Sequence, residues 1–144
     1  MAIPDERLYE YAVVRYVPRV DREEFVNIGL IMMCKRLKWL KGEVLLEESR
    51  LRAFDPKINL KSLQTQASLF MRTDVPSALL PVEERYRWLT AVKSAVLQVS
   101  PSHPGIIPDL TAASGHDSEF PEFSDKTAAL ESEFTRLFND LVSC

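Results

Sequence analysis

The fold that this sequence can adopt is decided by two neighbouring segments, Leu8-Tyr-Glu-Tyr-Ala-Val-Val-Arg-Tyr-Val17 and Phe25-Val-Asn-Ile-Gly-Leu-Ile-Met-Met-Cys34. Both are rich in β-branched and aromatic residues, and the linker between them, residues 18–24, is short and polar, as is typical of two antiparallel strands. The second segment is apolar on both of its faces. We therefore expect other elements to cover both sides of it.

The pairing of these strands predicts a polar spot on a sheet face. If residues 18–24 close a hairpin, Arg15 lies close to Asn27, and any even slip of register keeps both on one face. Gly29 is expected on that same face beside Val13, where its missing side chain lets another group approach. Two interpretations stay open: Arg15 lies along apolar surface or pairs with a carboxylate such as Glu24, or Arg15 and Asn27 face a ligand.

The rest of the chain shows further periodic segments. Residues 39–48 and 94–100 alternate as strands do, and residues 60–72 and 81–89 have helical spacing, with Asn59 as the expected N-cap of the first helix. A last helix is expected to begin at a capping Ser124 and to carry the apolar stripe Leu130, Phe134, Leu137, Phe138 and Leu141. Residues 101–124 are rich in proline and lack a sustained period, which predicts an irregular loop.

These segments together predict the fold class. We expect a single α+β domain over residues 1–144, with an antiparallel sheet of about four strands and the helices packed against it. The expected strand order is 3-2-1-4, because that order places the doubly apolar second strand inside the sheet.

Amino-acid composition and net charge argue against several classes of function. Lys and Arg number 18 against 21 Asp and Glu, so the net charge of −3 provides no overall field that would attract nucleic acid. Two cysteines do not form a disulfide framework, and no apolar run is long enough to span a membrane. The expectation is a cytoplasmic protein that binds neither nucleic acid nor membrane.

Familiar catalytic signatures are missing from the sequence. Four glycines do not form a phosphate-binding loop, and no Cys-x-x-Cys or His-x-x-x-His pair predicts a metal site. Cys34 lies within an apolar strand and is expected to be an inert core thiol. We therefore expect no cofactor and no metal, and the sequence alone leaves open whether the chain is an enzyme.

One cluster of donors remains as a candidate binding site. Arg87, Lys93 and Ser94 occur where the second helix is followed by the fourth strand. Arginine can bind a phosphate or carboxylate through two hydrogen bonds, and lysine adds a point charge. The candidate ligand-binding set is therefore Arg15, Asn27, Arg87, Lys93 and Ser94, while a solvated basic face explains the second cluster equally simply.

Three segments resemble the uncharacterised bacterial family DUF3037. They are the opening residues 11–18 with 24–29, the block at residues 84–91 with 98–101, and the ending at residues 137–142. The resemblance implies a bacterial protein without an assigned activity, encoded beside a kinase resembling HipA. Residues 107–125 are longer than the family pattern predicts.

Two functions follow as expectations. The first is a non-enzymatic accessory protein that binds another protein, with a HipA-like kinase as the implied partner. The alternative is a domain that binds a small ligand or phosphate through the Arg/Lys/Ser cluster, an enzyme included. Self-association stays open in both cases.

Overall fold

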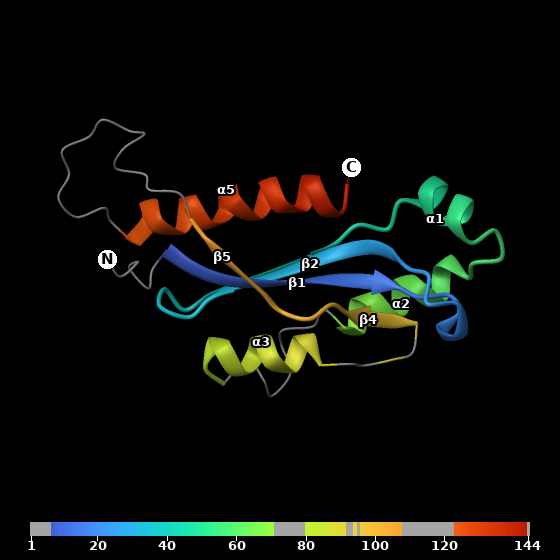
Figure 1. Ribbon diagram of the computed structural model, residues 1–144, viewed down its shortest axis with the longest axis horizontal. Helices are drawn as coiled ribbons and strands as arrows, with labels where there is room; N and C mark the ends of the chain where they lie inside the picture. Colours follow the sequence, from blue (N-terminus) through green and yellow to red (C-terminus); the bar gives the residue numbers. More distant parts are fainter. Residues whose placement is uncertain (1–6, 71–79, 92–93, 95, 108–122, 144) are drawn as a thin grey trace.

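The computed structural model describes residues 7–70, 80–91, 94, 96–107 and 123–143, and it shows an antiparallel sheet of five strands with helices on both faces (Figure 1). The strands are β1 (Leu8–Tyr16), β2 (Val26–Cys34), β3 (Trp39–Val44), β4 (Leu97–Val99) and β5 (His103–Ile106). Their order is β3-β2-β1-β4, and β5 also pairs with β1. The α+β class and the predicted strand order are confirmed.

Helices lie on both sides of this sheet. The longest, α5 (Phe123–Leu141), covers one face, which we name the α5 face (Figure 1). The opposite face, named the α3 face, packs against α1 (Glu48–Phe54), α2 (Leu60–Phe70) and α3 (Val82–Thr90). A short 3-10 helix, η2 (Val20–Arg22), lies in the connection from β1 to β2.

Strand β2 belongs to two hydrophobic clusters at once. Ile31 and Met33 are buried on the α3 face with residues of α1, α2 and α3, whereas Leu30 and Met32 are buried on the α5 face against α5. Each buried aliphatic side chain of this size contributes roughly 1.5–3 kcal/mol to folding. The expectation that both sides of β2 are covered is confirmed.

A β-bulge interrupts the pairing of β1 with β2. Val14 pairs with Gly29 and Arg15 pairs with Asn27, so Ile28 is an extra residue without a partner on β1. Because of this insertion, Ile28 is buried on the α3 face, and a Cβ at Gly29 would meet Val14 on that face too. The prediction that Gly29 shares a face with Asn27 is therefore wrong.

Strand β5 lies within residues that were predicted to be irregular. It continues the edge begun by β4, so that both pair with β1 along one line. Between them, Ser100 binds Val13 twice: the Ser100 N–H donates to the Val13 carbonyl, and the Val13 N–H donates to Ser100 Oγ, each at 2.9 Å. Pro104 is tolerated because an edge strand has one side without a partner, and this proline hid the strand from sequence analysis.

The other elements lie close to their predicted places, with one omission. The third strand ends at Val44 instead of residue 48, because the chain turns into α1, a helix that was not predicted. The cap of α2 is confirmed, since the Ser62 N–H donates to Asn59 Oδ1 at 3.0 Å. Helix α3 starts after Pro81 as expected, and α5 begins at residue 123, so Ser124 lies inside it and is not its cap.

Three tyrosines form hydrogen bonds between elements that are far apart in the sequence. Tyr9 on β1 donates to the buried carboxylate of Glu133 on α5, and Tyr16 donates to Asp55 Oδ2 at 2.7 Å. Tyr86 on α3 shares a hydrogen bond of 2.7 Å with Ser102. Burial is the main reason that the pKa of each of these phenols is raised to about 12; the neighbouring carboxylates add to the effect for Tyr9 and Tyr16.

We predict a loss of stability at alkaline pH. A pKa raised from 10.0 to about 12 means that the folded state binds its phenolic protons more tightly than the unfolded state. The resulting stability is complete below about pH 10 and is lost as the pH rises towards 12. Urea unfolding at a series of pH values should show this fall, and Tyr16→Phe should make it shallower. Equal stability at both ends of the range would contradict this role of the tyrosines.

Candidate functional site

Arg15 and Asn27 lie directly opposite each other on β1 and β2, so the prediction that they share a face is confirmed. Asn27 Nδ2 donates to the carbonyl of Leu141 at 3.1 Å, at the end of α5. Through this bond, Asn27 positions the C-terminal turn of α5 on the sheet. Asn27 therefore has a structural role that sequence analysis did not anticipate.

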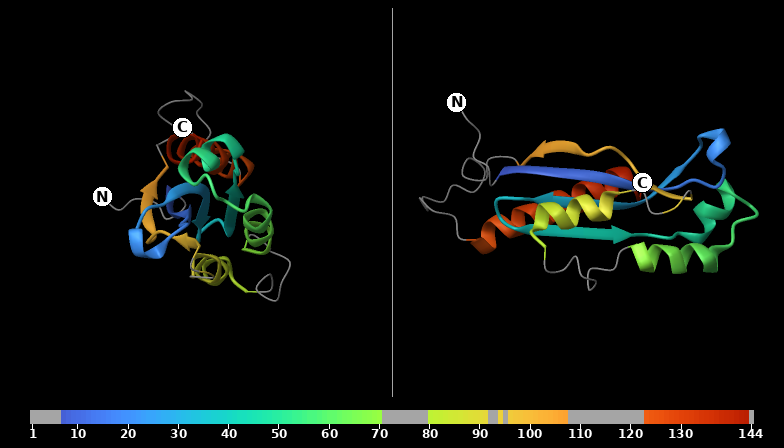
Figure 2. Two further views of the ribbon diagram at one scale, coloured as in Figure 1. Left: turned by 90° about the vertical axis from the view of Figure 1, so that its right-hand side faces the viewer. Right: turned by 90° about the horizontal axis from the view of Figure 1, so that it is seen from below.

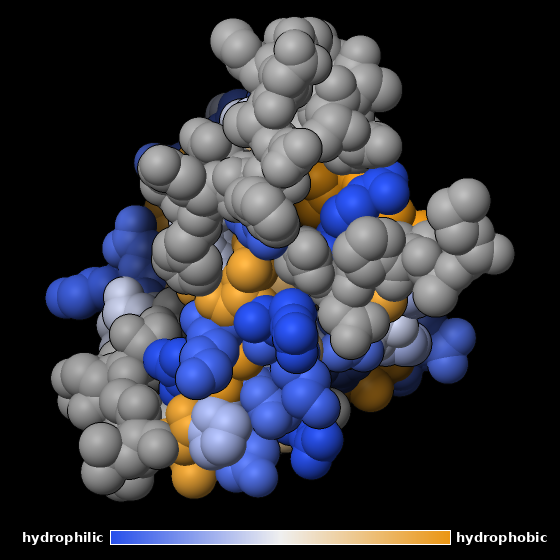
Figure 3. Space-filling view, turned by 90° about the vertical axis from the view of Figure 1, so that its left-hand side faces the viewer, coloured by the Kyte–Doolittle hydropathy of each residue, from blue (hydrophilic) through white to orange (hydrophobic). Residues whose placement is uncertain are grey.

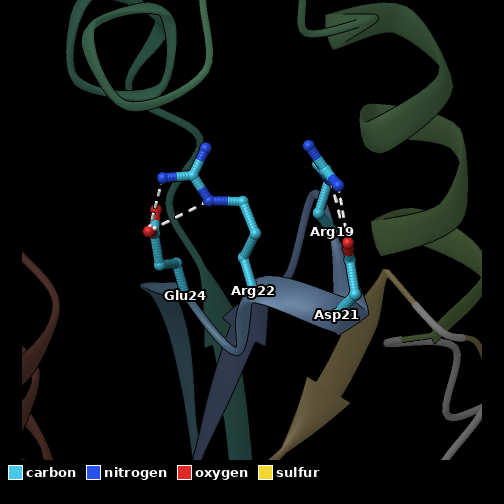
Figure 4. Close-up of polar contacts among 4 residues, drawn as sticks. All are labelled: Arg19, Asp21, Arg22 and Glu24. Carbon is cyan, nitrogen blue, oxygen red and sulfur yellow. Dashed lines mark hydrogen bonds and ion pairs between the residues drawn. The ribbon is translucent and has the colours of Figure 1, made fainter.

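Among the residues that the structure describes, Arg15 contacts an aromatic ring and no carboxylate. Its guanidinium carbon lies 4.1 Å from the centroid of the Phe25 ring, a cation–π geometry. Glu24, the suggested partner, instead binds Arg22 at 2.8 Å in the linker, next to the pair Arg19–Asp21 (Figure 4). Within the described part of the chain, Arg15 Nε is buried without a hydrogen-bond partner.

The second predicted cluster lies on the other side of the sheet. Arg87 is exposed in the last turn of α3, and Ser94 precedes β4. Ser94 Oγ accepts hydrogen bonds from the N–H groups of Val96 and Leu97 at 3.1 and 3.0 Å, so it shapes the entry to β4. Lys93 lies outside the described residues.

The candidate set is thus divided between two faces. Arg15 and Asn27 lie on the α5 face, whereas Arg87 belongs to a helix that packs on the α3 face. The structure brings the first two together and does not bring Arg87 or Ser94 to them. Ligand binding by any of these residues stays a prediction.

A groove that sequence analysis missed lies at one end of the sheet. Its volume is about 710 Å³, and we name it the end groove; it is lined by Leu8, Tyr9, Glu10, Met33, Lys35, Arg36, Lys38, Pro104 and Gly105. The lining comes from the start of β1, the end of β2, the β2–β3 turn and β5. Figure 3 shows this end of the molecule, where hydrophilic side chains surround apolar surface.

Helix α3 leaves this part of the sheet open. It packs against β2, and β5 and the start of β1 extend beyond it (Figure 2). Leu8 and Ile106 are direct partners on β1 and β5, and they are 40% and 46% exposed. An exposed apolar pair therefore adjoins the groove.

Positive charge surrounds the groove. Lys35, Arg36 and Lys38 come from the β2–β3 turn, which is closed by a hydrogen bond of 3.1 Å from the Lys38 N–H to the Lys35 carbonyl. Glu10 is the one carboxylate among the lining residues that the structure describes. The run Lys-Arg-Leu-Lys was visible in the sequence as a basic turn. The apolar residues that lie next to this turn in the groove could not be recognised in the sequence, because Pro104 reaches the groove only through long-range pairing of β5 with β1.

Across the described ranges, no three His, Cys, Asp or Glu side chains lie close enough to hold a metal ion. No described helix is both long enough and apolar enough to cross a membrane.

We predict that Arg15→Met lowers the free energy of unfolding by only about 0.5–2 kcal/mol, the range for a cation–π contact. Methionine keeps the apolar stem beside Phe25 and removes the charge. Urea unfolding of Arg15→Met, Phe25→Leu and the double variant should show that the two changes are coupled. A loss of 3–5 kcal/mol would contradict this account, since that is the cost of breaking a buried ion pair.

Comparison with known proteins places the chain in a family. The family model described as "Protein of unknown function (DUF3037)" matches residues 11–116, which include the first two segments that resemble the family but not residues 137–142. No curated protein matches the chain, and no solved structure matches it. Because the matched residues make up more than half of the chain, it belongs to the DUF3037 family, whose function is unknown.

Proposed function

We propose that this chain is a non-enzymatic interaction module that binds another protein. In this proposal the end groove receives a segment of the partner that carries acidic side chains and at least one apolar side chain. The supporting observation is the combination of three cations with apolar lining at an end of the sheet that α3 does not cover.

The chemistry of the groove explains the choice of partner segment. Leu8, Pro104 and the exposed Ile106 offer apolar surface next to each other, and such surface contributes binding affinity when a partner covers it. The Lys35, Arg36 and Lys38 charges around it favour acidic partners, speed their association and fix their orientation. A segment with both properties can contact the apolar lining and the cations of the groove at the same time.

The family resemblance supplies a first partner to test. A kinase resembling HipA is the candidate that the resemblance implies. The resemblance also implies a bacterial protein, and the composition predicts a cytoplasmic one. The proposal does not depend on that identity, because the groove specifies the chemistry of the segment and not the protein that carries it.

The alternative, a domain that binds a small ligand or phosphate, has less support. It requires several of the residues Arg15, Asn27, Arg87, Lys93 and Ser94 to converge on one pocket. Arg15 and Asn27 lie on the α5 face, Arg87 lies with α3 on the opposite face, and Ser94 is bound to the backbone before β4.

We predict that reversing the charge of the groove weakens partner binding. The test is co-expression and pull-down with the products of neighbouring genes, starting with a HipA-like kinase, followed by measurement of Kd. The double variant Lys35→Glu/Arg36→Glu should raise Kd about tenfold or more, equivalent to about 1.4 kcal/mol, and most strongly at low salt.

The matched control is Lys57→Glu/Lys61→Glu, which makes the same change of net charge at two exposed lysines away from the groove. This control should bind as the unchanged protein does. Equal binding by the groove variant and the control would show that the groove is not the binding surface. Absence of a complex with every neighbouring gene product would count against the interaction function itself.

A further inference from the structure

The outer edge of β3 is an open sheet edge. On its inner side β3 pairs with β2 from Trp39 to Val44. On its outer side, within the part of the chain that the structure describes, the backbone groups of Leu40, Gly42 and Val44 form no hydrogen bond. The opposite edge of the sheet is different, because Pro101 and Pro104 interrupt it, and proline protects an edge from pairing.

The direction of the backbone groups along β3 follows from one hydrogen bond. The Leu45 N–H donates to the carbonyl of Ile28 on β2 at 2.7 Å, so Leu45 turns its backbone groups inward. In an antiparallel pair this direction alternates with each residue. Glu43 and Lys41 therefore also bond inward, and Val44, Gly42 and Leu40 turn their N–H and C=O groups to the open edge.

This edge is self-complementary about Gly42. The outward-facing backbone groups of Leu40 and Val44 lie equally far from Gly42 on either side, and the charges of Lys41 and Glu43 lie equally far from it with opposite signs. A second copy running antiparallel and centred on Gly42 would meet matching groups at every position. Lys41 would lie opposite Glu43 of the second copy, and Leu40 opposite its Val44.

We propose that this chain forms a two-fold symmetric homodimer through the β3 edge, joining two five-stranded sheets into one continuous sheet. Backbone hydrogen bonds from Leu40, Gly42 and Val44 supply the pairing. Lys41 binds Glu131 of α5 at 2.5 Å within its own chain, and in the dimer it would also face Glu43 of the second copy. The two Lys41–Glu43 pairs then add cross-strand attraction, because opposite charges that face each other stabilise a sheet. Such an interface is closed, since the same patch is used on both copies.

The charges of Lys41 and Glu43 also favour this register over the neighbouring registers. A slip of two residues keeps the backbone groups compatible but places Glu43 opposite Glu43, or Lys41 opposite Lys41, of the second copy. A parallel arrangement in register likewise opposes like charges, and like charges directly opposite each other are destabilising. The centred antiparallel register is the one in which both pairs attract.

A hollow adjoins the β3 edge on one side. A hollow of about 380 Å³ is lined by Gly42, Glu43 and Val44 of β3, by Leu46 after it, and by Gln64, Ala67 and Ser68 of α2. Val44 packs on the α3 face, so Leu40 of the second copy, opposite Val44, would point into this side of the edge. None of the described residues that line the end groove belongs to β3, so dimer formation and partner binding can be tested separately.

The experiment is sedimentation equilibrium of the full chain over a wide concentration range. The unchanged protein should be in monomer–dimer equilibrium, and Glu43→Lys should raise the dimer Kd about tenfold or more, because both pairs then become Lys opposite Lys. Glu84→Lys makes the same change of charge on the exposed side of α3 and should leave the Kd unchanged. Glu43→Gln should give an intermediate Kd.

A mixing experiment gives a second readout. Lys41→Glu alone should weaken the dimer as Glu43→Lys does, but equimolar Lys41→Glu and Glu43→Lys should form a heterodimer, because each charge then meets its opposite. Lys41 also binds Glu131 at 2.5 Å, so circular dichroism must first show that Lys41→Glu is folded; if it is not, the comparison of Glu43→Lys with Glu84→Lys decides alone. A monomeric unchanged protein, or a dimer that Glu43→Lys does not weaken, would overturn the proposal.

Discussion

The structure depends on one constraint, which is that β2 must bury both of its faces while pairing with strands on both edges. Nine consecutive residues, Val26–Cys34, form this strand, and side chains of alternating direction enter two separate hydrophobic clusters. The bulge at Ile28 adjusts the alternation within the strand. It places Asn27 under the end of α5 and lets Ile28 and Gly29 both face the three helices of the other layer.

The helices that cover β2 leave two parts of the sheet exposed, and these parts are available for binding. Helix α5 and helix α3 are placed to cover the middle of the sheet, so the start of β1 with β5 remains open on the α3 face and β3 remains an outer edge. The end groove and the β3 edge are these two places. The first combines apolar surface with positive charge, and the second combines open backbone groups with paired opposite charges. Their different chemistry suits different partners.

Much of the fold could be predicted from the sequence, because strand and helix periods are local. The alternation at residues 8–17, the apolar segment at residues 25–34 and the stripe from Leu130 to Leu141 were sufficient for β1, β2 and α5. The bulge was not predicted, because a glycine inside a strand marks either a bulge or the close approach of another group, and Asn27-Ile-Gly29 does not distinguish the two. Strand β5 was hidden by Pro104, and the end groove by the fact that Leu8 and Ile106 become neighbours only through pairing. For the candidate site, proximity of Arg15 to Asn27 followed from register, whereas the separation of Arg87 from them depended on which face each helix covers.

The measurement that tests the central claim most directly is the stability of Gly29→Ala. A Cβ at residue 29 would lie 2.8 Å from the Glu43 carbonyl oxygen, 2.9 Å from Val44 Cγ2 and 3.2 Å from Val14 Cβ, because the bulge turns this position into the α3 face between β1 and β3. Overpacking of this kind costs about 1–3 kcal/mol. Urea unfolding should show that loss with an unchanged slope. Unchanged stability would mean that Gly29 faces open space, and it would contradict the bulge and the distribution of side chains between the two faces.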